Sequence, residues 1–179
     1  MRNPRLMTII GLIFAAAASR LIPHPPNMTS ITAVALFGGA YFSDRRLAFL
    51  VPFAALLLSD FILGSYDHME IVYLSFALVV CVGHWLQMRR SILYIAGAAL
   101  ASSVLFFLVT NFGVWALESL YPKTIAGLVA CYVAAIPFFE NQIQGDLFYT
   151  LLLFGGFRLL ESQFSILRDS RMAPDTLSA

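Results

Sequence analysis

Seven apolar stretches follow one another along the chain, and short polar breaks separate them. The breaks are rich in the proline, polar and paired-arginine residues that are typical of turns between helices. The apolar stretches are 6–22, 30–42, 47–64, 70–87, 92–117, 124–139 and 146–160. Because a helix needs about 20 apolar residues to cross the hydrocarbon core of a bilayer, the pattern predicts a bundle of membrane-spanning helices.

The positions of the basic residues indicate which stretches cross. Arginine and lysine concentrate in the cytoplasmic loops of membrane proteins. If the N-terminus is cytoplasmic and the stretches at 6, 30, 47, 70, 92 and 146 all cross, every basic residue except Arg20 and Lys123 lies inside. A full span at 124–139 would move the last arginines outside, so this segment, with its flanking Pro122 and internal Pro137, is expected to be a short helix that caps the outer face.

The expected fold is therefore an all-α integral membrane protein, a six-transmembrane-helix bundle with an extra short helix between spans five and six. One transmembrane domain covers 1–162 and a polar cytoplasmic tail covers 163–179. The localisation that fits is the bacterial inner (cytoplasmic) membrane, with both termini cytoplasmic. The first stretch also has features of a cleavable signal peptide, because two arginines precede it and Ala16-Ala17-Ala18-Ser19 resembles a cleavage site. A retained first helix is favoured because further spans follow at once.

Composition supports this assignment. Apolar residues make up 60% of the chain and charged residues only 12%, which is unlike the composition of a water-soluble domain. A net charge of +1 argues against a nucleic-acid partner, and the lipid bilayer is the expected surrounding. The two cysteines, Cys81 and Cys131, lie in apolar stretches and form no recognisable disulfide or metal motif.

This topology collects polar and aromatic side chains at the outer face, where a small-ligand pocket would open. Tryptophan and tyrosine also belong in interfacial belts without any ligand, so this structural explanation stays open. The candidate ligand-binding residues are His24, Asn27, Asp67, His68, Tyr73, Asn111 and Trp115.

Charged residues also occur inside the predicted spans, where an ionisable group is costly and usually faces a cavity or a partner. Asp60 is one, and Arg20 is its expected counter-ion, either as a structural pair or as part of a site. Asp146 is a weaker candidate because it could simply cap the start of the last helix.

Catalytic motifs are missing from the sequence. It contains no Gly-rich phosphate loop, no H-E-x-x-H and no G-x-S-x-G, and its carboxylates are dispersed. The protein is therefore not expected to be an enzyme. Cys81 and His84 are three residues apart on one helical face and could share a metal, but Cys-x-x-His alone is a weak signal.

Several motifs together resemble a family of small bacterial membrane proteins. They are Arg20-Leu-Ile-Pro-His-Pro-Pro-Asn27, Ala35-Leu-Phe-Gly-Gly-Ala-Tyr41, Leu58-Ser-Asp60 with Gly64, Thr110-Asn-Phe-Gly-Val-Trp115, Tyr121-Pro122 and Ala135-Ile-Pro-Phe-Phe139. In size and six-span layout the chain is similar to the substrate-binding S components of energy-coupling factor (ECF) vitamin transporters. It is most like the solitary cobalamin-uptake proteins of the BtuM type.

This resemblance implies uptake of a vitamin-type molecule, with cobalamin as the transported ligand and no intrinsic cofactor. Cys81 would then be a ligand of the corrinoid cobalt, since soft sulfur suits that metal. Ligand exchange or decyanation at cobalt would be a side activity of binding. Ala15 and Ser19 stand where S components carry two alanines, which argues against docking on an ECF coupling module.

The functional hypothesis is capture of the ligand at the outer face, beneath the segment 118–141, followed by delivery inward. Three alternatives remain from the sequence. One is an S-component-like transporter of another small solute, in which Cys81 is idle. The second is a non-transporting membrane scaffold protein. The third and least favoured is an intramembrane enzyme that depends on Asp60 or Asp146.

Overall fold

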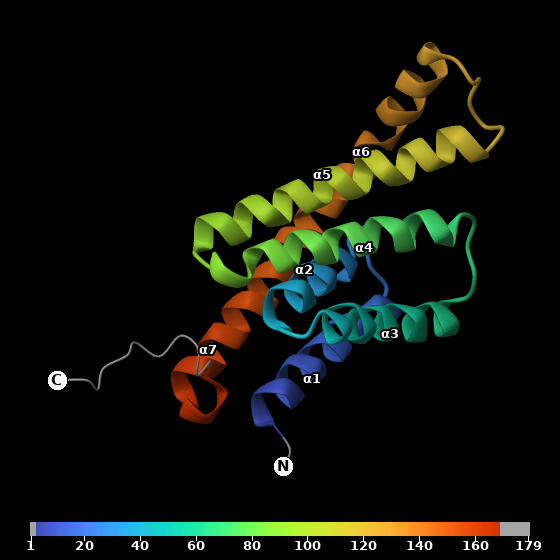
Figure 1. Ribbon diagram of the computed structural model, residues 1–179. Helices are drawn as coiled ribbons and strands as arrows, with labels where there is room; N and C mark the ends of the chain where they lie inside the picture. Colours follow the sequence, from blue (N-terminus) through green and yellow to red (C-terminus); the bar gives the residue numbers. More distant parts are fainter. Residues whose placement is uncertain (1–2, 169–179) are drawn as a thin grey trace.

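Every element in the computed structural model, which describes residues 3–168, is helical, so the all-α prediction is confirmed (Figure 1). Short 3-10 turns extend some of the helices, at Ser19–Leu21, Leu86–Met88 and Ser165–Leu167. The principal helices are α1 (Pro4–Ala18), α2 (Ile31–Tyr41), α3 (Arg45–Leu63), α4 (Met69–Trp85), α5 (Ile92–Leu117), α6 (Ile125–Thr150) and α7 (Gly156–Gln163).

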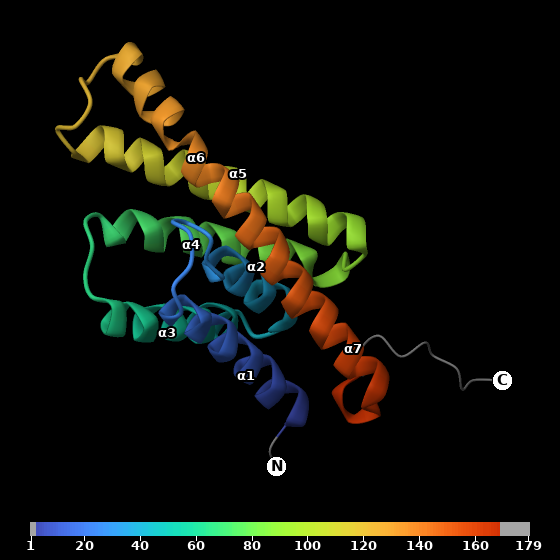
Figure 2. The same ribbon diagram turned by 180° about the vertical axis from the view of Figure 1, so that it is seen from behind.

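Five of the described helical stretches are long and apolar enough to cross a membrane, and α2 is not among them. The sequence predicts six spans, and the difference lies in this second segment. With 11 residues, α2 is only about 16 Å long, roughly half of the hydrocarbon thickness. An extended segment at 22–30 supplies the rest of the path from α1 into the bundle (Figure 2).

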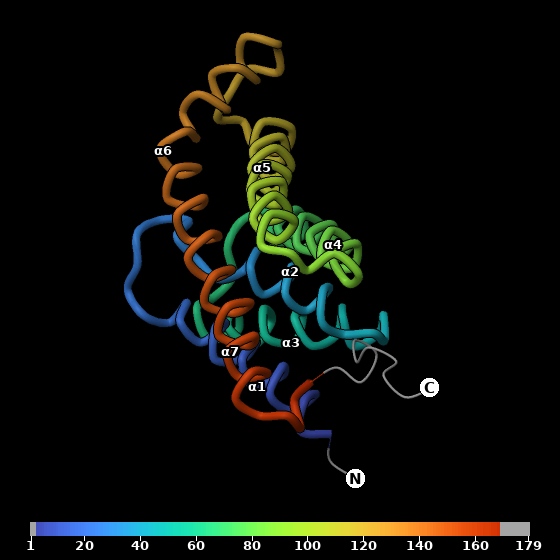
Figure 3. Tube along the Cα trace, turned by 90° about the vertical axis from the view of Figure 1, so that its left-hand side faces the viewer, coloured from blue at the N-terminus to red at the C-terminus, as the bar shows by residue number. Residues whose placement is uncertain are grey.

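The core of the protein is built around α2. All 11 residues of this helix are buried, and it lies between α3 and α4 when the molecule is viewed along the bundle (Figure 3). A helix that is apolar on every side must be enclosed on every side. Aromatic residues of α2 and of the last helix pack edge to face at its end, with the Phe37 and Phe157 ring centroids 5.8 Å apart.

Small residues allow α2 to approach its neighbours closely. Gly39 lies against Gly83 of α4, and Gly38 lies against Pro52 of α3. The same principle operates in α5, where Ala98, Ala99, Ser102 and Ser103 are buried. Small residues thus serve close helix packing here, because backbones in a membrane bundle approach best where side chains are small.

The last part of the fold differs most from the sequence-based prediction. The segments 124–139 and 146–160 are not separate helices, because a continuous helical stretch of 39 residues runs from Ile125 to Gln163. Pro137 lies inside α6 and does not end it, which is common where neighbouring helices surround the chain. A π-helical turn, Leu151–Gly155, joins α6 to α7. No short helix therefore caps the bundle as a separate element in residues 3–168.

Polarity separates the two ends of the bundle. The starts of α1 and α3, the connection from α4 to α5, and α7 lie towards one end, which we call the basic end because the predicted inside arginines of the described chain belong to these segments. The loops 64–68 and 118–124 lie at the other end, which we call the polar-loop end (Figure 1). Arg5 of α1 forms an ion pair with Glu161 of α7 and donates to the carbonyl of Leu167. The first residues of the predicted tail therefore pack against α1, and residues 169–179 lie outside the described part of the chain.

Candidate functional site

A buried ion pair marks the middle of the candidate site. Nη1 of Arg20, in the turn after α1, lies 2.7 Å from Oδ1 of Asp60, near the end of α3. Arg20 is 8% exposed and Asp60 is 3% exposed. Nη1 of Arg20 also donates to the hydroxyl of Ser59. Two opposite charges removed from water need further hydrogen bonds to offset the loss of hydration, and the Ser59 hydroxyl accepts one from Arg20.

Two tyrosines complete the surroundings of Asp60. The Tyr73 hydroxyl of α4 donates to Oδ2 of Asp60 at 3.0 Å, and the Tyr66 hydroxyl, from the loop before α4, does so at 3.4 Å. Burial raises the pKa of Tyr66 above the ordinary value of 10.0, and the nearby negative charge of Asp60 raises it further. Tyr66 therefore keeps its proton and remains a donor at neutral pH.

A cavity of about 340 Å³, which we call the polar cavity, begins at this ion pair and extends between α2, α5 and α6. Arg20 and Tyr66 line it on one side, and Gln142 lines it on the other. Its volume lies at the lower end of the range that small-molecule sites occupy. The remaining lining residues are Asn27, Thr29, Ile31, Thr32, Val72, Phe106, Phe107, Thr110, Asn111, Val114, Ala135 and Phe138.

A second buried carboxylate lies behind the cavity. Asp146 of α6 is 2% exposed and accepts a hydrogen bond from the Ser103 hydroxyl at 2.7 Å. Nε2 of Gln142 is 3.4 Å from Oδ2 of Asp146 and 3.2 Å from the carbonyl oxygen of Ser103. Asp146 is thus a mid-helix residue rather than a helix cap. Within residues 3–168 it has no cationic partner.

Hydrogen bonds already made by the lining residues determine what the polar cavity offers a ligand. Gln142 uses its amide nitrogen on Ser103 and Asp146, and Asn111 donates from Nδ2 to the Phe107 carbonyl at 2.8 Å. The Thr110 hydroxyl donates to the carbonyl of Phe106 at 2.8 Å. These side chains therefore leave oxygen atoms as acceptors. Nε of Arg20 is buried without a hydrogen-bond partner in the described chain and remains as a donor.

The structure brings three of the seven predicted ligand-binding residues to this site. Asn27 and Asn111 line the polar cavity, and Tyr73 binds Asp60. Asn27 holds its position with a positive φ of 63°, which asparagine tolerates better than most residues.

The other four predicted residues lie elsewhere. His24 is exposed, with Nδ1 2.7 Å from the carbonyl oxygen of Ile22, and Asp67 is exposed in the loop before α4. His68 precedes α4, and its Nε2 lies 3.7 Å from a Glu118 carboxylate oxygen. Nε1 of Trp115 donates to the carbonyl of Pro122 at 3.0 Å. The contacts of His68 and Trp115 hold the loops at the polar-loop end together.

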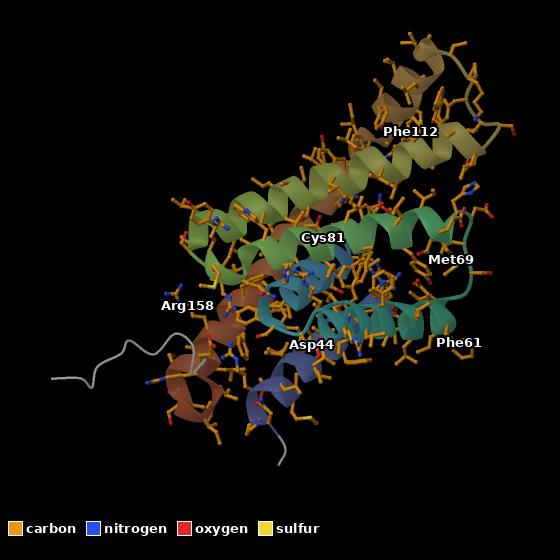
Figure 4. All side chains as sticks on the ribbon, viewed as in Figure 1. Asp44, Phe61, Met69, Cys81, Phe112 and Arg158 are labelled. Carbon is orange, nitrogen blue, oxygen red and sulfur yellow. The ribbon has the colours of Figure 1, made fainter. Side chains whose placement is uncertain are left out.

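Cys81 is an exposed residue of α4 (Figure 4), and it is not among the residues that line the polar cavity. Nine residues separate it from Val72, which lines the cavity, so the two side chains point to opposite sides of the helix. Cys81 lies in a shallow apolar groove of about 580 Å³ between α4 and α5, with Trp85 and Tyr94. No cluster of three or more His, Cys, Asp and Glu side chains suited to a metal ion occurs in residues 3–168. The structure does not bring Cys81 together with the other predicted site residues.

Sequence reasoning found only part of the α6 side of the site. Asp146 is expected from sequence at the start of a helix, as a weaker candidate or a cap, whereas Gln142 falls in the predicted break between two helices, and Thr32 and Ser103 are single polar residues in apolar runs. The available signal was the spacing of Gln142 and Asp146, four residues apart and hence on one face of a helix.

The long apolar helices define a membrane-spanning helical protein, and the polar cavity lies between several of these helices. The chain belongs to the family described as "Family of unknown function (DUF6580)", whose model matches residues 1–169. No curated protein and no solved structure shows significant similarity to the chain.

Proposed function

We propose that the protein is a membrane uptake protein that binds a small, vitamin-type solute in the polar cavity and delivers it towards the basic end. The observation that carries this proposal is the cavity itself, which places Arg20, Asn111 and Gln142 around one space inside a bundle of apolar helices. An ionisable side chain such as Arg20 is costly inside a membrane bundle, and such residues often mark a substrate pathway.

The chemistry of the lining suggests the class of solute. Oxygen acceptors from Asn111, Thr110 and Gln142 suit a molecule with several hydrogen-bond donors, such as amide, hydroxyl or ring N–H groups. Phe106, Phe107 and Phe138 add aromatic surface against which a flat ring can pack. Because Asp60 already balances the charge of Arg20, a neutral solute fits better than a strongly charged one.

The direction of uptake rests on the arrangement of charges. Arginines mark the cytoplasmic ends of bacterial membrane helices, so the basic end would face the cytoplasm and the polar-loop end would face outward. Asn27, which is exposed, and Tyr66, which is partly buried, line the polar cavity and belong to segments outside the long helices. A solute arriving from outside would meet these two residues before it reaches Gln142.

The experiment is thermal unfolding of the detergent-purified protein with thiamine, pyridoxine, nicotinamide, biotin, riboflavin or cobalamin. We expect one of them to raise the melting temperature, since a ligand at 100 times its Kd adds about 2.7 kcal/mol. Gln142→Leu should abolish the increase, whereas Gln144→Leu, an exposed glutamine on the same helix, should retain it. Asn111→Leu is a second variant within the cavity. No increase with any solute would favour the scaffold alternative, and an increase that persists in Gln142→Leu would place the ligand outside the cavity.

Cobalamin uptake, the specific form implied by resemblance to S components and the BtuM type, stays a prediction. A corrinoid is larger than the solutes that a cavity of about 340 Å³ holds. It would need α5 and α6 to separate, or it would need to bind in the groove beside Cys81. The visible spectrum of the protein after incubation with cobalamin tests this form, with Cys81→Ala beside the wild type. Bands that shift only with the thiol present would support it, and a colourless washed wild type would exclude it.

A further inference from the structure

A hollow larger than both the polar cavity and the groove beside Cys81 lies at the basic end of the bundle. We call it the basic groove, and its volume is about 750 Å³. It runs between the start of α5 and the end of the long C-terminal helix, where Figure 4 labels Arg158. One wall is apolar and the rim is basic. The apolar wall comprises Ile92, Ile95, Ala96, Leu147, Leu151 and Phe154, and the basic residues are Arg90, Arg158 and Arg168.

The rim of the basic groove is positively charged. Three arginines line it, and Glu161 is the acidic residue among the lining side chains. That glutamate already forms an ion pair with Arg5 of α1. Arg90 lies over the ring of Tyr41, with its guanidinium carbon 4.5 Å from the ring centroid, so its charge is held at the groove. Because Glu161 is paired with Arg5, the charges of Arg158 and Arg168 favour an anion at this position.

The backbone around the groove is also unusual. The π-helical turn Leu151–Gly155 contributes Leu151, Phe154 and Gly155 to the lining. Turns of this kind widen a helix locally and are frequent at functional sites. Thr150, just before this turn, lines the groove with a buried hydroxyl that has no hydrogen-bond partner in the described chain. A buried hydroxyl without a partner is costly, and a bound ligand would supply one.

We propose that the basic groove binds an anionic phospholipid of the surrounding leaflet. Its phosphate would lie at Arg158 and Arg168, and an acyl chain would follow the apolar wall. Basic pockets between transmembrane helices bind anionic lipid headgroups in this way. The apolar side of the groove opens towards lipid, since Ile92 is 75% exposed and Leu151 is 70% exposed. A free phosphate compound would leave this apolar wall uncovered, so the groove suits a lipid better. This site is independent of the polar cavity.

The test uses the full-length protein, freed of lipid in a neutral detergent, and follows its melting temperature during titration. The probes are phosphatidylglycerol, phosphatidylcholine with the same acyl chains, and free glycerol phosphate. We expect phosphatidylglycerol to stabilise the protein at concentrations where the other two do not. Arg158→Gln with Arg168→Gln should weaken this binding about 30-fold, or roughly fivefold for each arginine.

Matched control variants distinguish lipid binding in the basic groove from a general effect of positive surface charge. Arg45→Gln with Arg46→Gln removes two exposed arginines at the same end but outside the groove, and it should leave the affinity unchanged within about twofold. Ala96→Phe fills the apolar wall, keeps every arginine and should also weaken phosphatidylglycerol binding. Equal loss in the two double variants, equal stabilisation by phosphatidylcholine, or full stabilisation by glycerol phosphate alone would each overturn the proposal.

Discussion

Gly39 of α2 and Gly83 of α4 lie face to face, and neither position has room for a β-carbon. A β-carbon at Gly39 would overlap the carbonyl oxygen of Val80, and one at Gly83 would overlap the carbonyl oxygen of Leu36. Because the obstacle is backbone on both sides, no side-chain rearrangement can relieve it. This contact fixes the distance between α4 and the central helix.

Gly39→Ala should therefore destabilise the protein by about 1–3 kcal/mol or more, the usual cost of overfilling a packed interface. The measurement is reversible unfolding in detergent followed by circular dichroism. Gly11→Ala and Gly97→Ala are matched controls, because both glycines lie in helices with nothing within 4 Å of an added β-carbon. Alanine is the better helix former there, so a loss of stability in these controls equal to that of Gly39→Ala would contradict the explanation.

The Arg20–Asp60 pair should behave as a coupled unit. Removing one partner leaves a buried charge uncompensated, so Asp60→Asn or Arg20→Met should each cost about 3–5 kcal/mol. The double variant should cost less than the sum of the two single variants, and a double-mutant cycle measures the difference. Additive effects would mean that Ser59 and the two tyrosines, rather than the pair, hold each group in place.

Tyr66 should make stability fall at alkaline pH. Its pKa is raised in the folded protein by burial and by Asp60, so the folded state holds the proton more tightly than the unfolded chain. That contribution is fully present below the unfolded pKa of about 10 and is lost as pH rises through and above this value. Melting temperatures measured between neutral pH and about pH 11 should show a smaller decline in Tyr66→Phe than in the wild type. The same decline in both proteins would assign the alkaline loss to other groups.

The two cysteines should differ in reactivity. Cys81 is exposed on the lipid-facing surface of α4, whereas Cys131 of α6 is buried, with its sulfur 3.4 Å from the Asn111 carbonyl oxygen. A membrane-permeant maleimide should label Cys81 in the folded protein and reach Cys131 only after denaturation. Labelling of Cys81→Ala and Cys131→Ala, analysed by mass spectrometry of the intact chain, distinguishes the two sites. Rapid labelling of native Cys81→Ala would show that α5 and α6 separate at Cys131.

Long apolar runs made most of the helices predictable from sequence. The positions of the arginines predict a span at 30–42, but they do not distinguish a helix surrounded by lipid from one surrounded by protein. The break expected at 140–145 does not exist in the structure. Gln142 and Asp146 are polar, but Ser103 of α5 satisfies both inside the bundle, so the helix continues through them. In both cases the outcome depends on contacts between segments that are distant in the sequence: those that surround α2, and those between α5 and α6.

The candidate site likewise contains residues that could be predicted from sequence and residues that could be assigned only from the fold. Arg20 and Asp60 could be paired from sequence because two isolated opposite charges within apolar spans need each other. Tyr66 and Gln142 became part of the site only through the position of the 64–68 loop and the continuity of α6. His68 and Trp115, chosen for their chemistry, instead contact the 118–124 loop region at the polar-loop end.

The shortness of α2 also bears on how the protein is made. At 11 residues, this helix is too short to enter a bilayer as an independent span, and Gly39 faces Gly83, which the ribosome adds 44 residues later. When the first three helices have left the ribosome, α2 still lacks its packing partner α4. Correct assembly of the N-terminal third depends on synthesis reaching Gly83, so nascent chains truncated before α4 should be substrates for membrane quality-control proteases.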